Sequence, residues 1–247
     1  MFLDTLMNMK KYGKLFSLSI NENEYYEFTS SEDANRWGHL LYDDWANEYV
    51  KLEGTNDFHN TPIFIYTGTA YCAINKYKRG IETSIPPSYV KMADFSIPDA
   101  IHSAPHIPKK IVVYRIISGY INEYFKNIDG VFSPLLEKAF LSSSILSDKI
   151  VENISTLNDP EHPILLKIYV PNNTEAVFVN SIGDFPDSAE AELLINHNHY
   201  LYPIKYPYIN KDHNLLCVEC FLRIDCQVKC NTIREKNFEA PRRESEN

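Results

Sequence analysis

The sequence predicts a mixed α+β domain with helices in its first part and strands in the rest. Apolar residues recur at helical spacing as far as the prolines at 105 and 108, whereas after Lys110 they form short runs separated by turn residues. Helices and strands that are segregated along a chain, rather than alternating, favour the α+β class. With 247 residues, of which 44% are hydrophobic, the chain can bury one large core.

Three helices are predicted in the first part. Ser30, followed by Asp33, can cap the first helix. The apolar face of this helix is formed by residues at helical spacing, which are Trp37, Leu41, Trp45, Tyr49 and Leu52. The second helix is expected from about Tyr66 to Arg79, where Gly80 ends it, and the third just before the two prolines.

Short apolar runs predict a series of strands after Lys110. They are expected at Ile111 to Ile117, Ala139 to Ile145, Ile164 to Val170, Ala176 to Val179, Glu190 to Ile195, Tyr200 to Ile204 and from Leu216 onward. Turn residues such as Gly183 and Asp184 separate most of these runs, which is typical of an antiparallel sheet system.

Charge and hydropathy exclude two classes of partner. The net charge is −9 and no long run of Lys or Arg is present, so no nucleic-acid partner is expected. No stretch approaches the roughly 20 apolar residues of a membrane helix, so no membrane span is expected. The first twenty residues break their apolar runs with Asn and Lys, which makes a poor signal-peptide core.

The cysteines favour a strand over a metal site. The chain has five, an odd number that fits reduced thiols, and four crowd its end: Cys217, Cys220, Cys226 and Cys230. From Leu216 the even positions are apolar or cysteine and the odd ones are largely polar or charged, which predicts a half-buried strand. The spacing departs from the paired C-x2-C pattern of zinc sites, so zinc is the less favoured alternative and no metal is expected.

Arg115 lies in the middle of an apolar strand, on the same face as Val113 and Ile117. A buried guanidinium needs an anion, because leaving it unpaired is costly. A structural ion pair with one of the 33 acidic residues is the commoner solution. A diphosphate or carboxylate of a ligand, which the guanidinium fork can hold with two hydrogen bonds, is the functional alternative.

Two short motifs place oxygen atoms on strands. Ser142 and Ser144 share a face at the end of an apolar run. No Gly-x-Ser-x-Gly elbow is present, so a hydrolase nucleophile is not expected. A role in which a serine hydroxyl orients a carboxylate or a sugar remains open. Glu190 and Glu192 also share a face and lead into an apolar run. Their repulsion raises one pKa and supplies a general base or a stabiliser of positive charge, although an edge-strand solubility device is the alternative.

Tyr71, Asn75 and Arg79 form one stripe along the second predicted helix, at positions i, i+4 and i+8. An aromatic ring, an amide and a guanidinium in line can grip a purine nucleotide by stacking, hydrogen bonding and phosphate pairing. A solvated helix face is the commoner explanation of such a stripe.

Taken in order, these motifs resemble the arginine-specific mono-ADP-ribosyltransferase exoenzymes, a family of bacterial toxins and effectors with Arg, Ser-x-Ser and Glu-x-Glu motifs. The segments that carry the resemblance are Tyr66 to Arg79, Tyr114-Arg115, Phe140 to Ser144, Leu165 to Pro171 and Ala189 to Leu194. The resemblance implies an ADP-ribosyltransferase-like α+β fold, with two packed, mainly antiparallel sheets and N-terminal helices. It also implies NAD as substrate.

The resemblance implies roles for the motif residues. Arg115 matches the arginine that holds the NAD diphosphate, and Ser142 matches the serine that supports the nicotinamide ribose and the catalytic glutamate. Glu192 matches that catalytic glutamate, which stabilises positive charge on the ribose as the bond to nicotinamide breaks. Glu190 matches the companion that positions the acceptor arginine and helps remove its proton.

Further cofactor and target contacts follow from the same resemblance. The helix stripe of Tyr71, Asn75 and Arg79 matches the residues that meet the adenosine end of NAD. Ser144, the second serine of its motif, is assigned to the cofactor site, and Phe185 matches an aromatic residue of the target-recognition loop.

The sequence departs from the family pattern at two positions. Ser143 stands where threonine is usual, and Ile116 stands where many relatives have glycine. Neither change removes a required side chain, but Ile116, assigned to the cofactor site, can alter how nicotinamide contacts the backbone.

The resemblance implies that the chain transfers ADP-ribose from NAD to an arginine of a target protein, as a secreted toxin or effector that acts in the host cytoplasm. An NAD glycohydrolase with water as acceptor and a non-catalytic nucleotide-binding module stay open as alternatives. Residues 1–29 are expected to form an export or docking segment, 30–230 one catalytic domain and 231–247 a charged mobile tail. Since no second domain is recognised, delivery by a partner or a secretion apparatus is expected.

Overall fold

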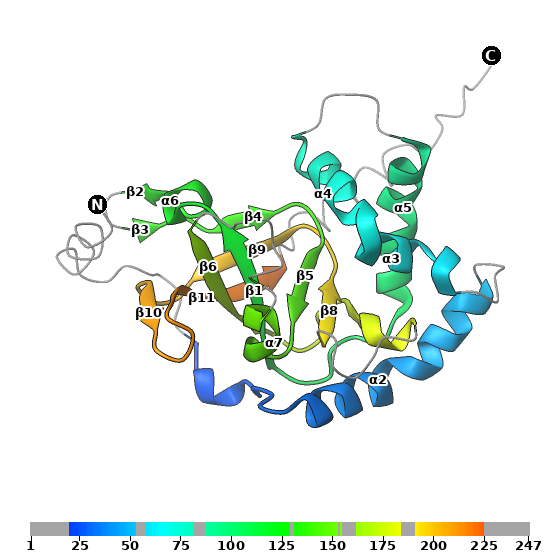
Figure 1. Cartoon of the computed structure of the whole chain (residues 1–247), viewed down its shortest axis with the longest axis horizontal. Coiled ribbons are helices and arrows are strands. Elements are labelled where there is room, and N and C mark those ends of the chain that lie inside the picture. Colours follow the sequence, from blue (N-terminus) through cyan, green and yellow to red (C-terminus); the bar gives the residue numbers. More distant parts are fainter. Residues whose placement is uncertain are drawn as a thin grey trace, which may run out of the picture.

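A computed structural model describes residues 20–52, 58–81, 87–128, 131–152, 154, 162–183 and 191–224. Its longer helices precede its sheet strands along the chain, which confirms the α+β prediction (Figure 1). None of the helices within these ranges is long and apolar enough to cross a bilayer.

The predicted helices are present, with one interruption. The long helices are α2 (Ser31–Leu52), α4 (Tyr71–Arg79) and α5 (Ser88–Ser103); the shorter turns are η1 (Glu22–Glu24), η2 (Phe58–Asn60), α3 (Pro62–Ile65), η3 (Tyr66–Ala70), α6 (Ile121–Tyr124), α7 (Ser147–Glu152) and η5 (Val179–Ser181). The backbone amide of Asp33 donates to Ser30 Oγ at 3.2 Å, which confirms the predicted cap. The helix predicted from Tyr66 is instead a π-helical turn followed by α4, because Gly68 adopts a non-helical ψ of −110°.

The buried face of α2 is offset by one position from the predicted one. Its fully covered residues are Ala34, Tyr42, Ala46 and Tyr49, whereas Trp37, Leu41 and Trp45 pack at the margin and are only partly buried. The offset follows from Gly38, where a Cβ atom would lie 2.3 Å from the ring of Phe178 in the sheet. The helix backbone therefore approaches the sheet along the small residues, and the tryptophans flank that contact.

Within the described residues, nine strands form one sheet in the order β4-β9-β11-β6-β1-β5-β8-β7, with β10 attached to β11. These strands are β1 (Ile111–Ser118), β4 (Leu135–Glu137), β5 (Leu141–Ser144), β6 (Pro163–Val170), β7 (Ala176–Phe178), β8 (Glu192–Ile195), β9 (His199–Pro203), β10 (Tyr208–Asn210) and β11 (Leu215–Ile224). A separate hairpin pairs β2 (Asn127–Ile128) with β3 (Val131–Phe132).

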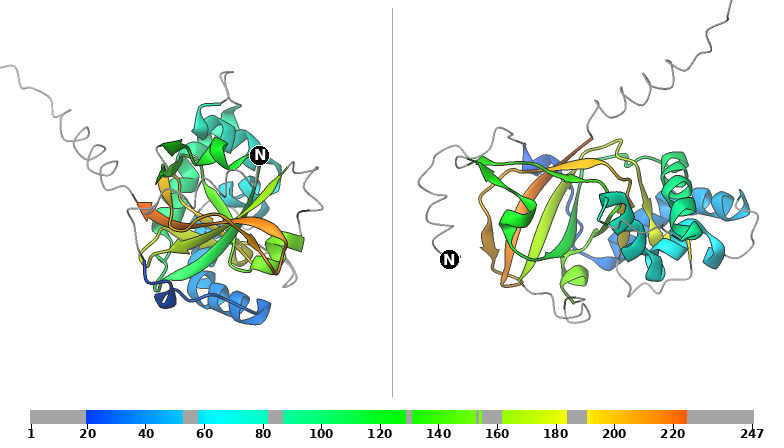
Figure 2. Two further views of the ribbon diagram at one scale, coloured as in Figure 1. Left: turned by 90° about the vertical axis from the view of Figure 1, so that its left-hand side faces the viewer. Right: turned by 90° about the horizontal axis from the view of Figure 1, so that it is seen from above.

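The sheet consists of two blocks that meet at β1. One block contains β6, β11, β9 and β4, with β10 attached, and the other contains β5, β8 and β7. That strand pairs with β6 along its whole length, from Ile111↔Val170 to Ser118↔Pro163, whereas the described contact with β5 is the single pair Tyr114↔Ser144. The two expected sheets are thus joined through this pair, and their strands fan around one another with a strong twist (Figure 2). All described pairings between these strands are antiparallel except that of β6 with β11.

The helices cover one block of the sheet. Figure 1 shows α3, α4 and α5 gathered beside β5 and β8, while α2 runs along the side that carries β7. One apolar cluster joins these layers, with Tyr42, Ile74 and Ile97 from the helices and Val113 and Phe178 from the strands. Since the same core fixes the helices and both sheet blocks, it also fixes the side chains at their junction.

The packed domain begins before residue 30. Tyr26 pairs with Ile111 of β1, and the ring of Phe28 is buried against Trp37. Residues 20–29 therefore pack on the sheet. Residues 1–19 and the predicted tail at 231–247 lie outside the described residues, so the roles predicted for these segments stay predictions.

The cysteine-bearing strand is present, but it is not half-buried. Val218, Cys220 and Leu222 enter the main core, while Cys217 is covered on the other face by a second cluster that includes Tyr114. Burial raises the pKa of the Cys217 thiol to about 11, as expected of an inert packed thiol. Both faces are covered because β11 lies between β6 and β9 rather than at an edge. Cys226 and Cys230 lie outside the described residues.

Candidate active site

A serine and a glutamate meet where β5 pairs with β8. Ser142 Oγ donates to Glu192 Oε1 at 2.5 Å. The strand register pairs Ser144 with Glu192, so Ser142 is the diagonal neighbour, within reach of a long side chain on the same face. Both partners are half-buried, and the carboxylate therefore has a fixed hydroxyl on one oxygen while the pair stays accessible.

The other two serines of the run serve the backbone. Ser143 Oγ donates to the carbonyl of Leu193 at 2.9 Å, and Ser144 Oγ donates to the carbonyl of Leu146 and accepts from its amide. Ser144 is fully buried. A covered hydroxyl with two local partners has no surface to offer a dinucleotide, so its placement disagrees with the assignment of Ser144 to direct NAD contact. It suits a residue that holds the end of β5.

Arg115 is a half-buried cation that has no anionic partner among the described residues. It lies on β1 opposite Leu166, with Val113 and Ile117 of the same face in or against the main core, as predicted. Its Nη1 atom is buried and has no hydrogen-bond partner. No ion pair joins it to an acid anywhere in the described ranges, so the structural ion pair, the commoner of the two explanations, is not found there. The ligand alternative thereby gains support.

A cavity of about 420 Å³ lies over this part of the sheet. Its lining comprises Arg79, Ile81, Arg115, Ile116, Ile117, Ser118, Tyr124, Leu135, Leu136, Glu137, Leu141, Leu166 and Leu201. Three of the predicted cofactor residues, Arg79, Arg115 and Ile116, therefore line one hollow. Ser142 and Glu192 are not lining residues, but Ser142 follows Leu141 of the wall, and Tyr66 feels the charges of both Arg115 and Glu192, so the serine and glutamate pair lies near the cavity.

Glu137 is a cavity residue that sequence reasoning missed. It accepts two hydrogen bonds from the Arg79 guanidinium, at 2.9 Å to Nε and 2.7 Å to Nη2. The amide of Ala139 donates to the same carboxylate at 3.0 Å. This fork fixes the direction of Arg79 across the cavity wall. A single glutamate at the end of an apolar run carries no sequence signal that would predict it.

Tyr66 is a second missed residue, and it marks the convergence of the charges. Asn75 Nδ2 donates to its hydroxyl at 2.9 Å, so the predicted stripe residue Asn75 is buried and held. Burial raises the pKa of Tyr66, and its hydroxyl feels the charges of Arg115, Glu192 and Glu137. Charged residues of β1, β8 and β4 therefore lie near this hydroxyl of the helix layer. Tyr71, the first residue of the stripe, is 45% exposed.

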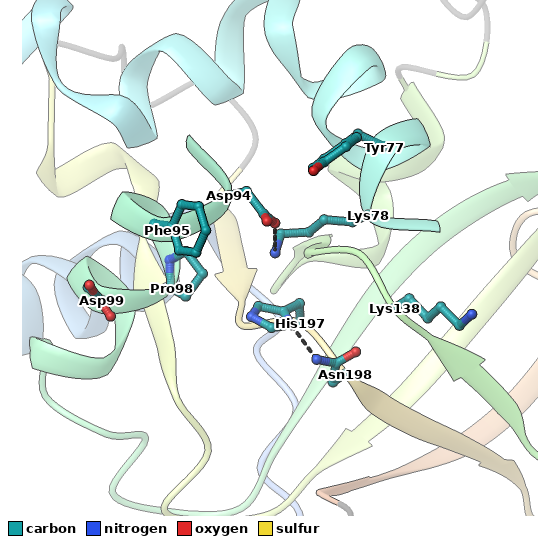
Figure 3. A pocket seen from close by; sticks show the side chains of 9 residues that line it. All are labelled: Tyr77, Lys78, Asp94, Phe95, Pro98, Asp99, Lys138, His197 and Asn198. Carbon is teal, nitrogen blue, oxygen red and sulfur yellow. Dashed lines mark hydrogen bonds and ion pairs between the residues drawn. The ribbon is translucent and has the colours of Figure 1, made fainter. Parts of the chain in front are cut away.

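A second cavity, of about 550 Å³, lies between α4, α5 and the turn after β8 (Figure 3). It contains an ion pair between Lys78 Nζ and Asp94 Oδ1 at 2.6 Å, with the ring of His197 nearby. Burial, followed by the charge of Lys78, lowers the pKa of His197 to about 4.

Phe140 separates the second cavity from Tyr66. Its ring lies 5.6 Å from that of His197 and 5.3 Å from that of Tyr66, measured between centroids. Lys78 Nζ lies 4.7 Å from the Phe140 centroid. The same ring thus supports a wall of the second cavity and the buried tyrosine of the candidate site.

Two predicted residues lie outside the described residues, namely Glu190 and Phe185. The description resumes at Ala191, which is fully buried and immediately precedes Glu192. The roles of Glu190 and Phe185 stay predictions.

Comparisons with solved structures find the same fold in bacterial toxins. BECa, an ADP-ribosylating toxin of a binary enterotoxin of C. perfringens, has 21% identity and a TM-score of 0.62 over 81% of this chain and 50% of its own, so the chain spans half the length of BECa. Plx2a, an ADP-ribosyltransferase toxin from Paenibacillus larvae, has 22% identity and a TM-score of 0.57 over 78% of this chain and 96% of its own. C3stau2 from S. aureus, solved with NAD, has 14% identity and a TM-score of 0.57 over 82% of this chain and 100% of its own.

These identities establish a shared fold, and the sequence itself provides the family. No curated protein matches the chain. The sequence model of the ADP-ribosyltransferase exoenzymes, however, matches residues 34–220, which include the helix layer, Arg115, the serine run and Glu192. With a fold of this class and a family match over most of its length, the chain belongs to the ADP-ribosyltransferase exoenzyme family.

Proposed function

We propose that the protein is a mono-ADP-ribosyltransferase that moves ADP-ribose from NAD to an arginine side chain of a target protein. The family supplies the general reaction, ADP-ribosyl transfer. The observation that carries the proposal is the 2.5 Å hydrogen bond between Ser142 and Glu192, close to Tyr66, which also feels the charge of the cavity residue Arg115. The arginine as acceptor rests on the sequence Glu190-Ala191-Glu192.

Arg115 would hold the diphosphate of NAD. Its buried Nη1 has no hydrogen-bond partner in the part of the chain that the structure describes, and a diphosphate offers the paired oxygen atoms that the guanidinium fork binds best. Arg79 lines the same cavity wall, where Glu137 pairs with its guanidinium, so it would meet the adenosine end of NAD as a held hydrogen-bond donor rather than as a free charge. Ile116 lines the same hollow and would contact the nicotinamide.

Glu192 would act on the bond between ribose and nicotinamide. Bound NAD supplies a ribose whose leaving group is already cationic. A carboxylate beside the anomeric carbon stabilises the positive charge that develops there, and it does so best when its orientation is set in advance. Ser142 sets that orientation through its hydrogen bond to Oε1. Ser144 contributes indirectly, by holding the strand end opposite Glu192.

Glu190 and Phe185 would act on the acceptor. Glu190 precedes Glu192 by two positions, and the strand alternation predicted from the sequence would put the two carboxylates on the same face, next to each other. An arginine keeps its proton at neutral pH because its pKa is above about 12, and a carboxylate that accepts this proton during attack makes it a nucleophile. Phe185, which matches an aromatic residue of the family's target-recognition loop, would contact the target surface around that arginine.

The proposed setting is a bacterial toxin or effector that acts in the cytoplasm of a host cell, delivered by a partner or a secretion apparatus. Residues 1–19 would carry the export or docking signal, since residues 20–29 pack on the sheet. Deletion of residues 1–19 should leave catalysis intact and abolish delivery into target cells. Delivery that survives this deletion would contradict the proposed signal.

Labelling tests the activity. The purified chain is incubated with NAD labelled in its adenylate portion and with host-cell lysates, and labelled proteins are mapped by mass spectrometry. The expected result is ADP-ribose on an arginine of one protein. Release of nicotinamide without labelled protein would overturn the proposal in favour of a glycohydrolase, and NAD binding without nicotinamide release would overturn it in favour of a non-catalytic module.

A further inference from the structure

Two histidines and a glutamate meet at the far end of α5, away from the proposed NAD cavity. His102 lies in the last turn of that helix, His106 in the segment after it, and Glu175 directly before β7. One ligand atom from each residue lies within 4.8 Å of the others. Imidazole nitrogens together with a carboxylate oxygen form a donor set typical of zinc and neighbouring transition-metal ions.

Backbone pairing holds the two sides of this cluster together. The amide of Ile107 donates to the carbonyl of Thr174 at 3.1 Å, and the amide of Asn173 donates to the carbonyl of Ile107 at 2.8 Å. Because His106 and Glu175 are the direct neighbours of these paired residues, their separation is fixed by the main chain. The cluster is therefore a feature of the fold, independent of any chance meeting of long surface side chains.

Glu175 is oriented toward the histidines by a second residue. Asn196 Nδ2 donates to Glu175 Oε2 at 2.8 Å, and the backbone amide of Asn196 donates to the carbonyl of Glu175. The other carboxylate oxygen, Oε1, lies 2.9 Å from His102 Nδ1. Outer hydrogen bonds of this kind, which aim a ligand at its metal, recur in protein metal sites. The glutamate is buried, whereas both imidazoles are exposed and free to rotate.

We propose that His102, His106 and Glu175 bind a divalent transition-metal ion of the zinc type, with a water molecule in the remaining position. Ligand atoms around tetrahedral zinc lie about 3.4 Å apart, given bond lengths of about 2.0 to 2.2 Å. The ligand atoms of His102, His106 and Glu175 now lie within 4.8 Å of one another, and rotation of the two exposed imidazole rings would shorten these separations to about the zinc value. On binding, the ion would take the place of the hydrogen bond between His102 Nδ1 and Glu175 Oε1.

The ion would clamp the end of α5 to the block of the sheet that carries Glu192. Asn196, which orients Glu175, directly follows β8, and β7 pairs with β8 from Ala176↔Ile195 to Phe178↔Leu193. Metal ligation across these elements stabilises the folded state by the mass action of binding. The proposed role is structural, because the three ligands join the end of α5 to the segment that leads into β7.

A simple ion pair is the competing explanation, and the chain offers a matched control for it. His39 Nδ1 lies 2.9 Å from Asp43 Oδ1 on α2, the same geometry as His102 and Glu175 but without a third ligand in the described residues. The variants His106→Ala and Glu175→Gln therefore test the proposed metal site, and Asp43→Asn is the control. His106→Ala is the decisive change, because it leaves the pair of His102 with Glu175 in place.

Calorimetric titration of the chelator-treated full chain with Zn²⁺ tests the proposal. The native chain and Asp43→Asn should bind one ion and show a raised Tm, whereas affinity should fall at least about tenfold in His106→Ala and Glu175→Gln. Absorption spectra of the Co²⁺ complex distinguish binding by cysteines from binding at the proposed site, because thiolate ligands produce an intense ultraviolet band that nitrogen and oxygen ligands lack. The proposal is overturned if the native chain binds no ion, if His106→Ala binds as tightly, or if Co²⁺ reports thiolate ligation.

Discussion

At the scale of single residues, the Ser142 hydroxyl is the structural element that orients Glu192. Ser142→Ala removes the 2.5 Å hydrogen bond and leaves the strand intact. A hydrogen bond to a charged group is worth about 1.5 to 3 kcal/mol, so kcat for nicotinamide release should fall about 10- to 100-fold with little change in KM for NAD. Steady-state kinetics of the variant measure both constants. Ser142→Thr, which keeps the hydroxyl, should retain most of the activity, and equal losses in the two variants would argue against the orienting role.

Arg115 should matter for NAD and hardly at all for folding. Its Nη1 is buried without a partner, so replacement by an apolar side chain of similar length removes an uncompensated charge. Arg115→Met should therefore unfold at an equal or higher urea concentration while its affinity for NAD falls more than tenfold. Urea denaturation and calorimetry with NAD measure the two effects. A large loss of stability with unchanged NAD affinity would indicate a structural ion pair instead.

His197 should make the fold sensitive to acid. Burial and the nearby Lys78 lower its pKa to about 4, from 6.5 in the unfolded chain, so the unfolded state binds the proton first as the pH falls. This stabilising contribution is complete above pH 6.5 and is lost toward pH 4. A pKa unit corresponds to about 1.4 kcal/mol, which leaves on the order of 2 kcal/mol after a discount for partial exposure.

The measurement for His197 is the free energy of unfolding in urea at several pH values. His197→Gln cannot titrate and should flatten the curve between pH 6.5 and 4. An unchanged slope in that variant would show that other groups cause the acid sensitivity.

Some site residues could be predicted from the sequence and others could not. Strand alternation placed Arg115 on the core face, and the Ser-x-Ser and Glu-x-Glu patterns pointed to oxygen atoms on strands. Tyr66 and Glu137 depend on contacts between residues 9 and 58 positions apart, which no local pattern encodes. Ser144 was assigned by its motif, but its hydroxyl is used by the backbone next to it.

At the scale of elements, the contact between α2 and β7 depends on the absence of a side chain at one position. A Cβ atom at residue 38 would lie 2.3 Å from Phe178, which is itself fully buried and has no room to move. Gly38→Ala should therefore lower the free energy of unfolding by about 3 kcal/mol, despite the better helix propensity of alanine. Urea denaturation measures this change.

Leu40 on the same helix provides the control for Gly38. It is 83% exposed, so Leu40→Ala should change stability by less than about 0.5 kcal/mol. If Gly38→Ala proved as stable as this control, the close approach of α2 to the sheet would be wrong.

The positions of the helices along the chain could be predicted from the sequence, but the faces that the helices bury could be predicted only in part. The cap at Ser30 and the end at Gly80 follow from local chemistry, and Gly80 indeed has a left-handed φ of 70°. The π-helical turn at Tyr66–Ala70 was not predicted, because the residues through it keep an apolar spacing that suits a regular helix. The buried face of α2 differs from the predicted one because small residues, such as Gly38, contribute little to a hydrophobic pattern but permit the closest approach of the helix to the sheet.

At the scale of the whole molecule, the order of helices and strands along the chain could be predicted, but the order of strands in the sheet could not. The parallel pair of β6 with β11 joins residues far apart in sequence and depends on how the two blocks close. The same closure brings Arg115, Ser142 and Glu192 from three adjacent strands to one end of the helix layer. The proposed site thus depends on the order of the strands in the sheet.

The most direct test of this account measures nicotinamide release and transfer of ADP-ribose to polyarginine in parallel for the native chain, Glu192→Gln and Glu190→Gln. Glu192→Gln should lower both reactions by about three orders of magnitude or more, because it removes the carboxylate that stabilises the ribose cation. Glu190→Gln should keep nicotinamide release and lose transfer. Activity of Glu192→Gln within tenfold of the native chain would contradict the catalytic assignment, and equal losses in both variants would contradict the separate roles of the two glutamates.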